Sequence, residues 1–127
     1  MHRSANDLVA AARARIREVA PTDFAAHPTP VLIDVREPAE YDTGHLPGAV
    51  NIPRGVLEFQ VDAHPAVANV TDPALAHRER PVVVYCRTGG RAALAAVALQ
   101  GLGFSDVRSI AGGITGWTEA GLPVTMR

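Results

Sequence analysis

Two short apolar runs constrain the fold of this chain more than any other feature of its sequence. VLIDV, from Val31 to Val35, and VVVY, from Val82 to Tyr85, are dominated by β-branched residues and follow prolines. A strand that is apolar at successive positions has no face suited to water, so it is buried on both sides, as in a parallel sheet covered by helices. The sequence therefore predicts an α/β domain.

The remaining segments alternate between helical and extended patterns. A helix is predicted over 6–19, capped by Ser4 or Asn6 and turning extended near Ile16, and a short helical turn follows with Thr22 as its cap. Further elements are then predicted in chain order: helical turns over 37–43, a short strand over 49–52, a helical turn over 55–59, a helix from Thr71 or Asp72 to Arg78, a buried helix over 91–102, a strand over 106–110 and a short helix within 112–121.

Composition narrows the class of protein. A chain of 127 residues suits one domain spanning 1–127, and a net charge of −1 gives no reason to expect nucleic acid or a membrane surface as partner. No apolar run approaches the roughly 20 residues that cross a bilayer, and a secretory pattern is missing, so a cytoplasmic protein is expected. The five histidines have no paired spacing, so neither a metal nor another cofactor is predicted.

The single cysteine, Cys86, directly follows the second apolar run and begins the segment CRTGGR. Ligands of α/β sheets bind at the carboxyl ends of strands, where Cys86 is expected to lie. Gly89 and Gly90 allow a tight bend in which backbone N–H groups turn toward the sulfur, and the helix starting near Arg91 adds its positive end. These surroundings favour the nucleophilic thiolate, whereas the alternative is a small hydrophobic residue at a strand end.

Three stretches in order carry a resemblance to a known family: LIDVREPAEYDTGHLPGAVNIP, CRTGGR and GGITGW. Together they resemble the single-domain rhodanese-like sulfurtransferases over 31–124, with a weaker match to the helix and extension of 1–30. The resemblance implies a three-layer fold, in which helices flank both faces of a five-stranded parallel sheet. It also implies transfer of a sulfane sulfur from a donor such as thiosulfate to a thiol or cyanide acceptor, through a persulfide on Cys86.

Carried over residue by residue, the resemblance makes Cys86 the catalytic residue and its loop the substrate-binding residues, namely Arg87, Thr88, Gly89, Gly90 and Arg91. Arg87 is expected to point outward toward the donor. Arg91 is expected to pair with Glu40, because a guanidinium offers two parallel donors to a carboxylate.

Supporting roles are predicted for three upstream residues. Asp34 and Arg36 are expected to complete the network beneath the loop. His45 is interpreted as a structural hydrogen-bonding residue rather than a catalytic base. Trp117 is expected to anchor the core.

The stretch 54–75 is irregular, and its place is open. Leu57 and Phe59 could border the acceptor site from a flap over the loop, but we favour the interpretation that both fill the core.

Two other functions remain as alternatives. A cysteine-dependent phosphatase or arsenate reductase would place five residues between cysteine and arginine, whereas four separate Cys86 from Arg91 here. A non-catalytic binding or regulatory module would keep the fold without turnover. The expected partners are a small-molecule sulfur donor and a thiol or cyanide acceptor, with a protein thiol as one form of acceptor, and the chain could act as a monomer or a homodimer.

Overall fold

Five parallel strands form the centre of the molecule in a computed structural model that describes residues 2–29, 31–62, 75 and 77–126. The sheet order is β1-β5-β4-β2-β3, and every neighbouring pair is parallel. The strands are β1 (Arg17–Val19), β2 (Val31–Asp34), β3 (Val50–Asn51), β4 (Val82–Tyr85) and β5 (Val107–Ile110). The predicted five-stranded parallel α/β fold is confirmed, and β4, the strand that Cys86 directly follows, lies at its centre.

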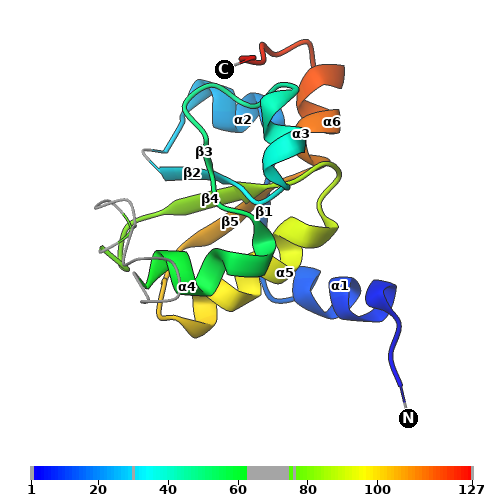
Figure 1. Ribbon diagram of the computed structural model, residues 1–127, viewed down its shortest axis with the longest axis vertical. Helices are drawn as coiled ribbons and strands as arrows, with labels where there is room; N and C mark the ends of the chain where they lie inside the picture. The colour runs from blue at the N-terminus through cyan, green and yellow to red at the C-terminus, as the bar shows by residue number, and fades with distance from the viewer. Residues whose placement is uncertain (1, 30, 63–74, 76, 127) are drawn as a thin grey trace.

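Helices cover both faces of the sheet, as Figure 1 shows. They are α1 (Ala5–Arg13), α2 (Pro21–Ala26), α3 (Pro38–Asp42), the 3-10 helix η1 (Arg54–Val56), α4 (Leu57–Val61), α5 (Gly90–Gly101) and α6 (Gly113–Glu119). In the view of Figure 1, α2, α3 and α6 lie above the sheet and α1, α4 and α5 lie below it. The loop from β4 to α5 emerges at the right-hand side, between these two layers.

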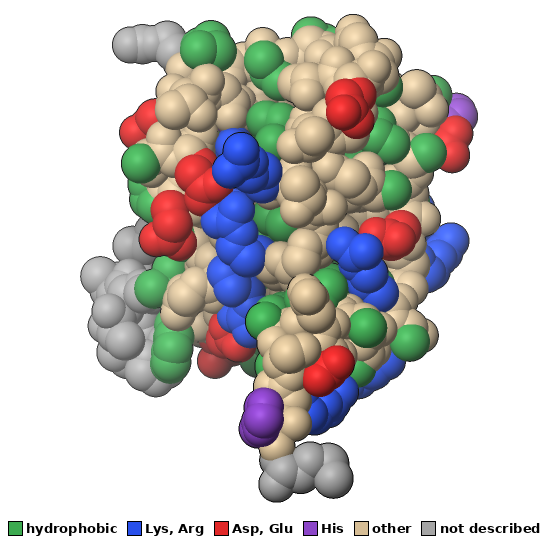
Figure 2. Space-filling model, turned by 90° about the vertical axis from the view of Figure 1, so that its right-hand side faces the viewer, with side chains coloured by type: hydrophobic (Ala, Val, Ile, Leu, Met, Phe, Trp, Pro, Cys, Tyr) green, Lys and Arg blue, Asp and Glu red, His purple; other side chains and the backbone are tan. Residues whose placement is uncertain are grey.

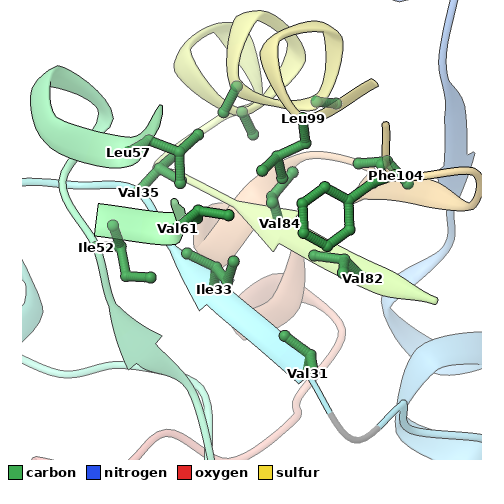
Figure 3. Packing of buried hydrophobic residues seen from close by; sticks show 14 of the residues in the cluster. Val31, Ile33, Val35, Ile52, Leu57, Val61, Val82, Val84, Leu99 and Phe104 are labelled. Carbon is green, nitrogen blue, oxygen red and sulfur yellow. The ribbon is translucent and has the colours of Figure 1, made fainter. Parts of the chain in front are cut away.

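Successive side chains along β2 and β4 point to opposite faces of the sheet, and this alternation divides the core into two layers. Val31, Ile33, Val82 and Val84 pack toward α4 and α5 (Figure 3), and Cys86 belongs to the same cluster. Leu32 and Val83, at the positions between them, belong to the cluster on the opposite face of the sheet, beneath α2 and α6. Complete burial of a Val, Ile or Leu side chain stabilises a fold by about 1.5 to 3 kcal/mol, so these two layers hold β4 firmly in the middle of the molecule.

The N-terminal segment forms a shorter helix than the pattern over 6–19 predicts. Ser4 caps α1 by accepting a hydrogen bond from the backbone N–H of Asp7, and the helix ends at Arg13. The chain then becomes extended near Ile16, as expected, and supplies the edge strand β1. Among the five strands, β1 is therefore the one with the weakest pattern in the sequence.

The prediction that Thr22 caps the next helix is wrong. Helix α2 begins at Pro21, and its N-cap is Ala20, which makes no side-chain cap hydrogen bond. Proline suits the first helical position because its φ is already helical and a free N–H there would have no partner within the helix. The proline therefore starts the helix one residue before the threonine.

The prediction that Leu57 and Phe59 both fill the core is half correct. Leu57 is buried, as is Val61 one helical turn later, because residues four apart share a face of α4. Phe59 lies two positions on from Leu57, where a helix turns to its opposite side, and is 46% exposed. Phe59 is therefore not a core residue.

One predicted helix, from Thr71 to Arg78, falls mostly outside the described residues. Within the described part, 77–80 form a turn in which the backbone N–H of Arg80 donates to the carbonyl of His77. Across the described residues, every helix is too short or too polar to cross a membrane.

Candidate active site

Cys86 follows the last residue of β4 and is almost completely buried, with 1% of its surface exposed. Its Sγ accepts a hydrogen bond from the backbone N–H of Gly89 at 3.0 Å and another from that of Ala92 at 3.4 Å. Gly89 is the N-cap of α5 and has a φ of +126°, a conformation that side-chain-bearing residues rarely adopt. The loop and the first turn of α5 therefore each turn one backbone donor toward the sulfur, at the positive end of this 12-residue helix.

The N-terminus of α6 holds this loop from the opposite face of the sheet. The backbone N–H of Ile114 donates to the carbonyl of Cys86 at 2.9 Å, and that of Thr115 donates to the carbonyl of Arg87 at 3.1 Å. A Cβ at Gly113 would lie only 2.4 Å from the carbonyl oxygen of Cys86. The glycines of GGITGW thus allow the close approach that fixes the cysteine peptide.

The predicted pair of Arg91 and Glu40 is present. Arg91 donates from Nη1 to Oε1 at 2.7 Å and from Nη2 to Oε2 at 3.0 Å, in the two-pronged geometry typical of arginine and carboxylate. The hydrogen bond from Arg91 lowers the pKa of Glu40 to about 2, and the reciprocal interaction raises the pKa of Arg91. This pair joins the first turn of α5 to α3 on the other layer.

Asp34 and Arg36 form a buried pair that supports α3. Arg36 donates from Nη2 to Asp34 Oδ2 at 2.8 Å and to the carbonyl of Gly44 at 2.7 Å. Burial alone would lower the pKa of Arg36, but its hydrogen bonds to Asp34 and the neighbouring negative charges together outweigh burial, so the net direction of the pKa is upward. Tyr85, beside the same carboxylate, has a raised pKa because of burial and Asp34. The network fixes the turns on both sides of α3.

His45 makes structural contacts. Its ring stacks on that of Tyr41, with 3.7 Å between centroids, and its Nδ1 lies 3.2 Å from the Tyr41 carbonyl oxygen. Its backbone pairs with that of Thr125 through hydrogen bonds of 2.8 and 2.7 Å. Trp117 is buried as expected and donates from Nε1 to the carbonyl of Pro123.

A cleft of about 540 Å³ opens beside the cysteine loop. Its walls come from α3, α6, the loop and the C-terminal segment, namely Arg36, Ala39, Glu40, Thr43, Gly44, Arg87, Ile114, Thr115, Thr118 and Val124. Arg87 is exposed, in agreement with the outward orientation predicted for it, and Thr88 is exposed as well. Cys86 does not line the cleft, since the loop covers its sulfur.

Three residues near the cysteine loop escape the sequence-based prediction. Thr115 and Thr118 of α6 line the cleft, although GGITGW indicates only close helix packing. Arg13, at the end of α1, lies against Gly89. The signal that could locate them is the geometry of helix docking, which a single sequence does not display.

The fold and the site define a class: an α/β domain with a buried cysteine at the end of its central strand, whose sulfur accepts hydrogen bonds from two backbone N–H groups. Within the described residues, no cluster of three or more histidine, cysteine or acidic side chains could hold a metal ion. The family model described as "Rhodanese-like domain" matches residues 21–120. The chain belongs to this family.

Its relatives include sulfurtransferases. A "Sulfurtransferase" of Allochromatium vinosum is 32% identical over 94 residues, which cover 74% of this chain and 77% of the relative. The "Thiosulfate sulfurtransferase GlpE" of Pseudomonas syringae is 34% identical over 87 residues, or 68% of this chain and 71% of the relative.

A solved structure from Rhodopseudomonas palustris matches nearly the whole chain. Its TM-score is 0.83 at 29% identity, and the match covers 98% of this chain and 96% of that one. It is described as a protein of unknown function and a possible tyrosine phosphatase. Its coverage includes α1, which precedes the segment matched by the family model.

Proposed function

We propose that this protein transfers a sulfane sulfur from an anionic donor such as thiosulfate to a thiol or to cyanide through a persulfide on Cys86. The family supports sulfurtransferase activity, because several curated relatives carry that name. The observation that carries the proposal is the pair of backbone N–H groups, from Gly89 and Ala92, that donate to the cysteine sulfur.

In the first step, the Cys86 thiolate attacks the outer sulfur of thiosulfate. A new S–S bond forms at Cys86 while the S–S bond of thiosulfate breaks, and its electron pair leaves with sulfite. Backbone donors that already point at the reaction centre stabilise the anion there without reorganising. In this proposal Arg87, an exposed residue that lines the cleft, binds the sulfonate oxygens during this step.

In the second step, the acceptor attacks the terminal sulfur of the persulfide. A thiolate becomes a persulfide, or cyanide becomes thiocyanate, and the electron pair of the broken S–S bond returns to Cys86 as thiolate. The sulfur of Cys86 therefore starts and ends the cycle as a thiolate. The cycle also needs no second cysteine, which a mechanism through a disulfide within the chain would require. Since charge and protons balance without a general base, the structural contacts of His45 agree with this scheme.

The roles assigned to the loop and its supports belong to this proposal. Gly89 and Gly90 let the loop bend, Thr88 forms part of its exposed surface, and Arg91 ties the start of α5 to Glu40. Asp34, Arg36 and His45 position α3 and the segments beside it.

Turnover with thiosulfate and cyanide tests the proposal. The wild-type protein should release sulfite and thiocyanate in equal amounts, and Cys86→Ser should release neither. A correctly folded wild-type protein that produces neither compound would point instead to a binding or regulatory module.

Phosphatase activity is the second candidate, because the structural neighbour from R. palustris is described as a possible tyrosine phosphatase. The loop geometry opposes it. A cysteine phosphatase surrounds a tetrahedral phosphate with a wider loop, in which five residues separate cysteine and arginine, whereas four separate Cys86 from Arg91 here. Hydrolysis of p-nitrophenyl phosphate that is lost in Cys86→Ser would favour the phosphatase, and we expect none above background.

A further inference from the structure

Helix α1 lies along α5, next to the cysteine loop, and precedes the segment that the family model matches (Figure 1). Its last residue, Arg13, places Nη2 at 3.0 Å from the position that a Cβ on Gly89 would occupy. One turn earlier, Val9 lies 3.7 Å from the corresponding position on Gly90. The two glycines of the loop are therefore in contact with α1, and a guanidinium covers the glycine whose N–H donates to the sulfur.

The guanidinium of Arg13 has no carboxylate partner among the described residues, and the same holds for Arg87. Arg91, by contrast, is held by Glu40. In the described part of the chain, two cations without a carboxylate partner thus lie at the cysteine loop: Arg87 is part of this loop, and Arg13 lies against it. Figure 2 shows arginine side chains running down this side of the molecule, with acidic side chains beside part of the run.

We propose that Arg13 is a second anion-binding residue of the active site, supplied by the N-terminal helix, which binds a doubly charged sulfur donor together with Arg87. The inference rests on the proposed function, because it assigns the residue to the donor of that reaction. A dianion such as thiosulfate offers sulfonate oxygens that two guanidinium groups can share, while its outer sulfur faces Cys86.

A purely structural role for Arg13 is the competing explanation. A cation in the last turn of a helix interacts favourably with the helix dipole, and Arg13 occupies such a position in α1. That role would show in the free energy of unfolding and would not depend on the charge of the substrate. A role in anion binding predicts the reverse: replacing Arg13 should weaken the binding of anions at the loop, and the effect should depend on the charge of the substrate.

Steady-state kinetics of Arg13→Gln separate these explanations. We expect KM for thiosulfate to rise about fivefold, the scale of one exposed ionic contact, while kcat changes less than about twofold. Arg13→Lys should recover part of the loss. The matched control is Arg15→Gln, which removes the same charge from a side chain that lines a separate groove with Leu94 and Val97.

Alkylation of Cys86 provides a readout that does not depend on sulfur transfer. The rate with iodoacetate, an anion, is divided by the rate with neutral iodoacetamide, so that any change in thiolate content cancels. Arg13→Gln should lower this ratio about threefold relative to wild type, and Arg15→Gln should leave it unchanged. An unchanged ratio in Arg13→Gln, or no alkylation by either reagent, would overturn the inference. If the ratio falls but thiosulfate leaves no sulfur on the wild-type protein, Arg13 binds anions and the proposed function fails instead.

Discussion

Replacing Gly113 by alanine should damage both the stability of the protein and the position of its cysteine loop. A Cβ at this position would lie 2.4 Å from the Cys86 carbonyl oxygen and 2.6 Å from that of Arg87, closer than real Cβ contacts allow. The residue also has a φ of +58°, in the left-handed region. Either the loop or the N-terminus of α6 must therefore move.

The expected loss of stability has two parts. Left-handed backbone costs a residue with a side chain roughly 1 to 2 kcal/mol. Separation of α6 from the loop weakens the hydrogen bonds that Ile114 and Thr115 donate to the two carbonyls, each worth about 1 kcal/mol. We expect Gly113→Ala to lower the free energy of unfolding by about 3 to 4 kcal/mol, a large part of the 5 to 15 kcal/mol typical of a domain.

A matched control isolates the steric part. Gly121 has a φ of +78° but no atom within 4 Å of a built Cβ, so Gly121→Ala carries the backbone strain without the collision. Urea unfolding followed by the fluorescence of Trp117, the single tryptophan, gives both free energies. If Gly113→Ala loses no more stability than Gly121→Ala, the close approach of α6 to the cysteine loop is refuted.

Three further predictions concern the charged residues that support the loop. In a double-mutant cycle, Arg91→Ala and Glu40→Ala should show a coupling of about 1 kcal/mol in the free energy of unfolding, and additive losses would remove the contact. The pKa of Glu40 falls from 4.5 to about 2 in the folded protein. The stability that this carboxylate contributes is therefore complete above about pH 4.5 and lost as pH falls toward 2, so the difference between wild type and Glu40→Gln should shrink over that range. Asp34→Asn should cost about 3 to 5 kcal/mol, because it leaves Arg36 buried without a carboxylate. Asp106→Asn, in a partly exposed pair with Arg108, should cost about 1 kcal/mol or less. Equal losses in urea unfolding would contradict the buried network.

The central part of the fold could be predicted because its residues carry local signals. VLI and VVVY are short, rich in β-branched residues and apolar at successive positions, which is typical of strands buried on both faces. The loop after Cys86 combines glycines with a following helix, and this pattern indicates N–H groups turned toward the sulfur. The pair of Arg91 and Glu40, 51 residues apart, followed from the family resemblance and the chemistry of guanidinium and carboxylate.

The errors and omissions concern features that depend on how helices dock. Phe59 has the same apolar character as Leu57, and only the orientation of a five-residue helix decides which of the two is buried. Thr22 is a good capping residue, but the preceding proline fits the first helical position. Arg13 contacts Gly89 across 76 residues of chain because α1 packs on α5, and nothing in its own neighbourhood of the sequence indicates this.

The central claim, that Cys86 receives and releases one sulfur atom, is tested most directly by intact-protein mass. After incubation with thiosulfate and removal of excess donor, the wild-type protein should be heavier by one sulfur atom, and cyanide should return it to its original mass. Cys86→Ser should keep its mass throughout. A wild-type mass that does not change, or a sulfur gained equally by Cys86→Ser, would contradict the account.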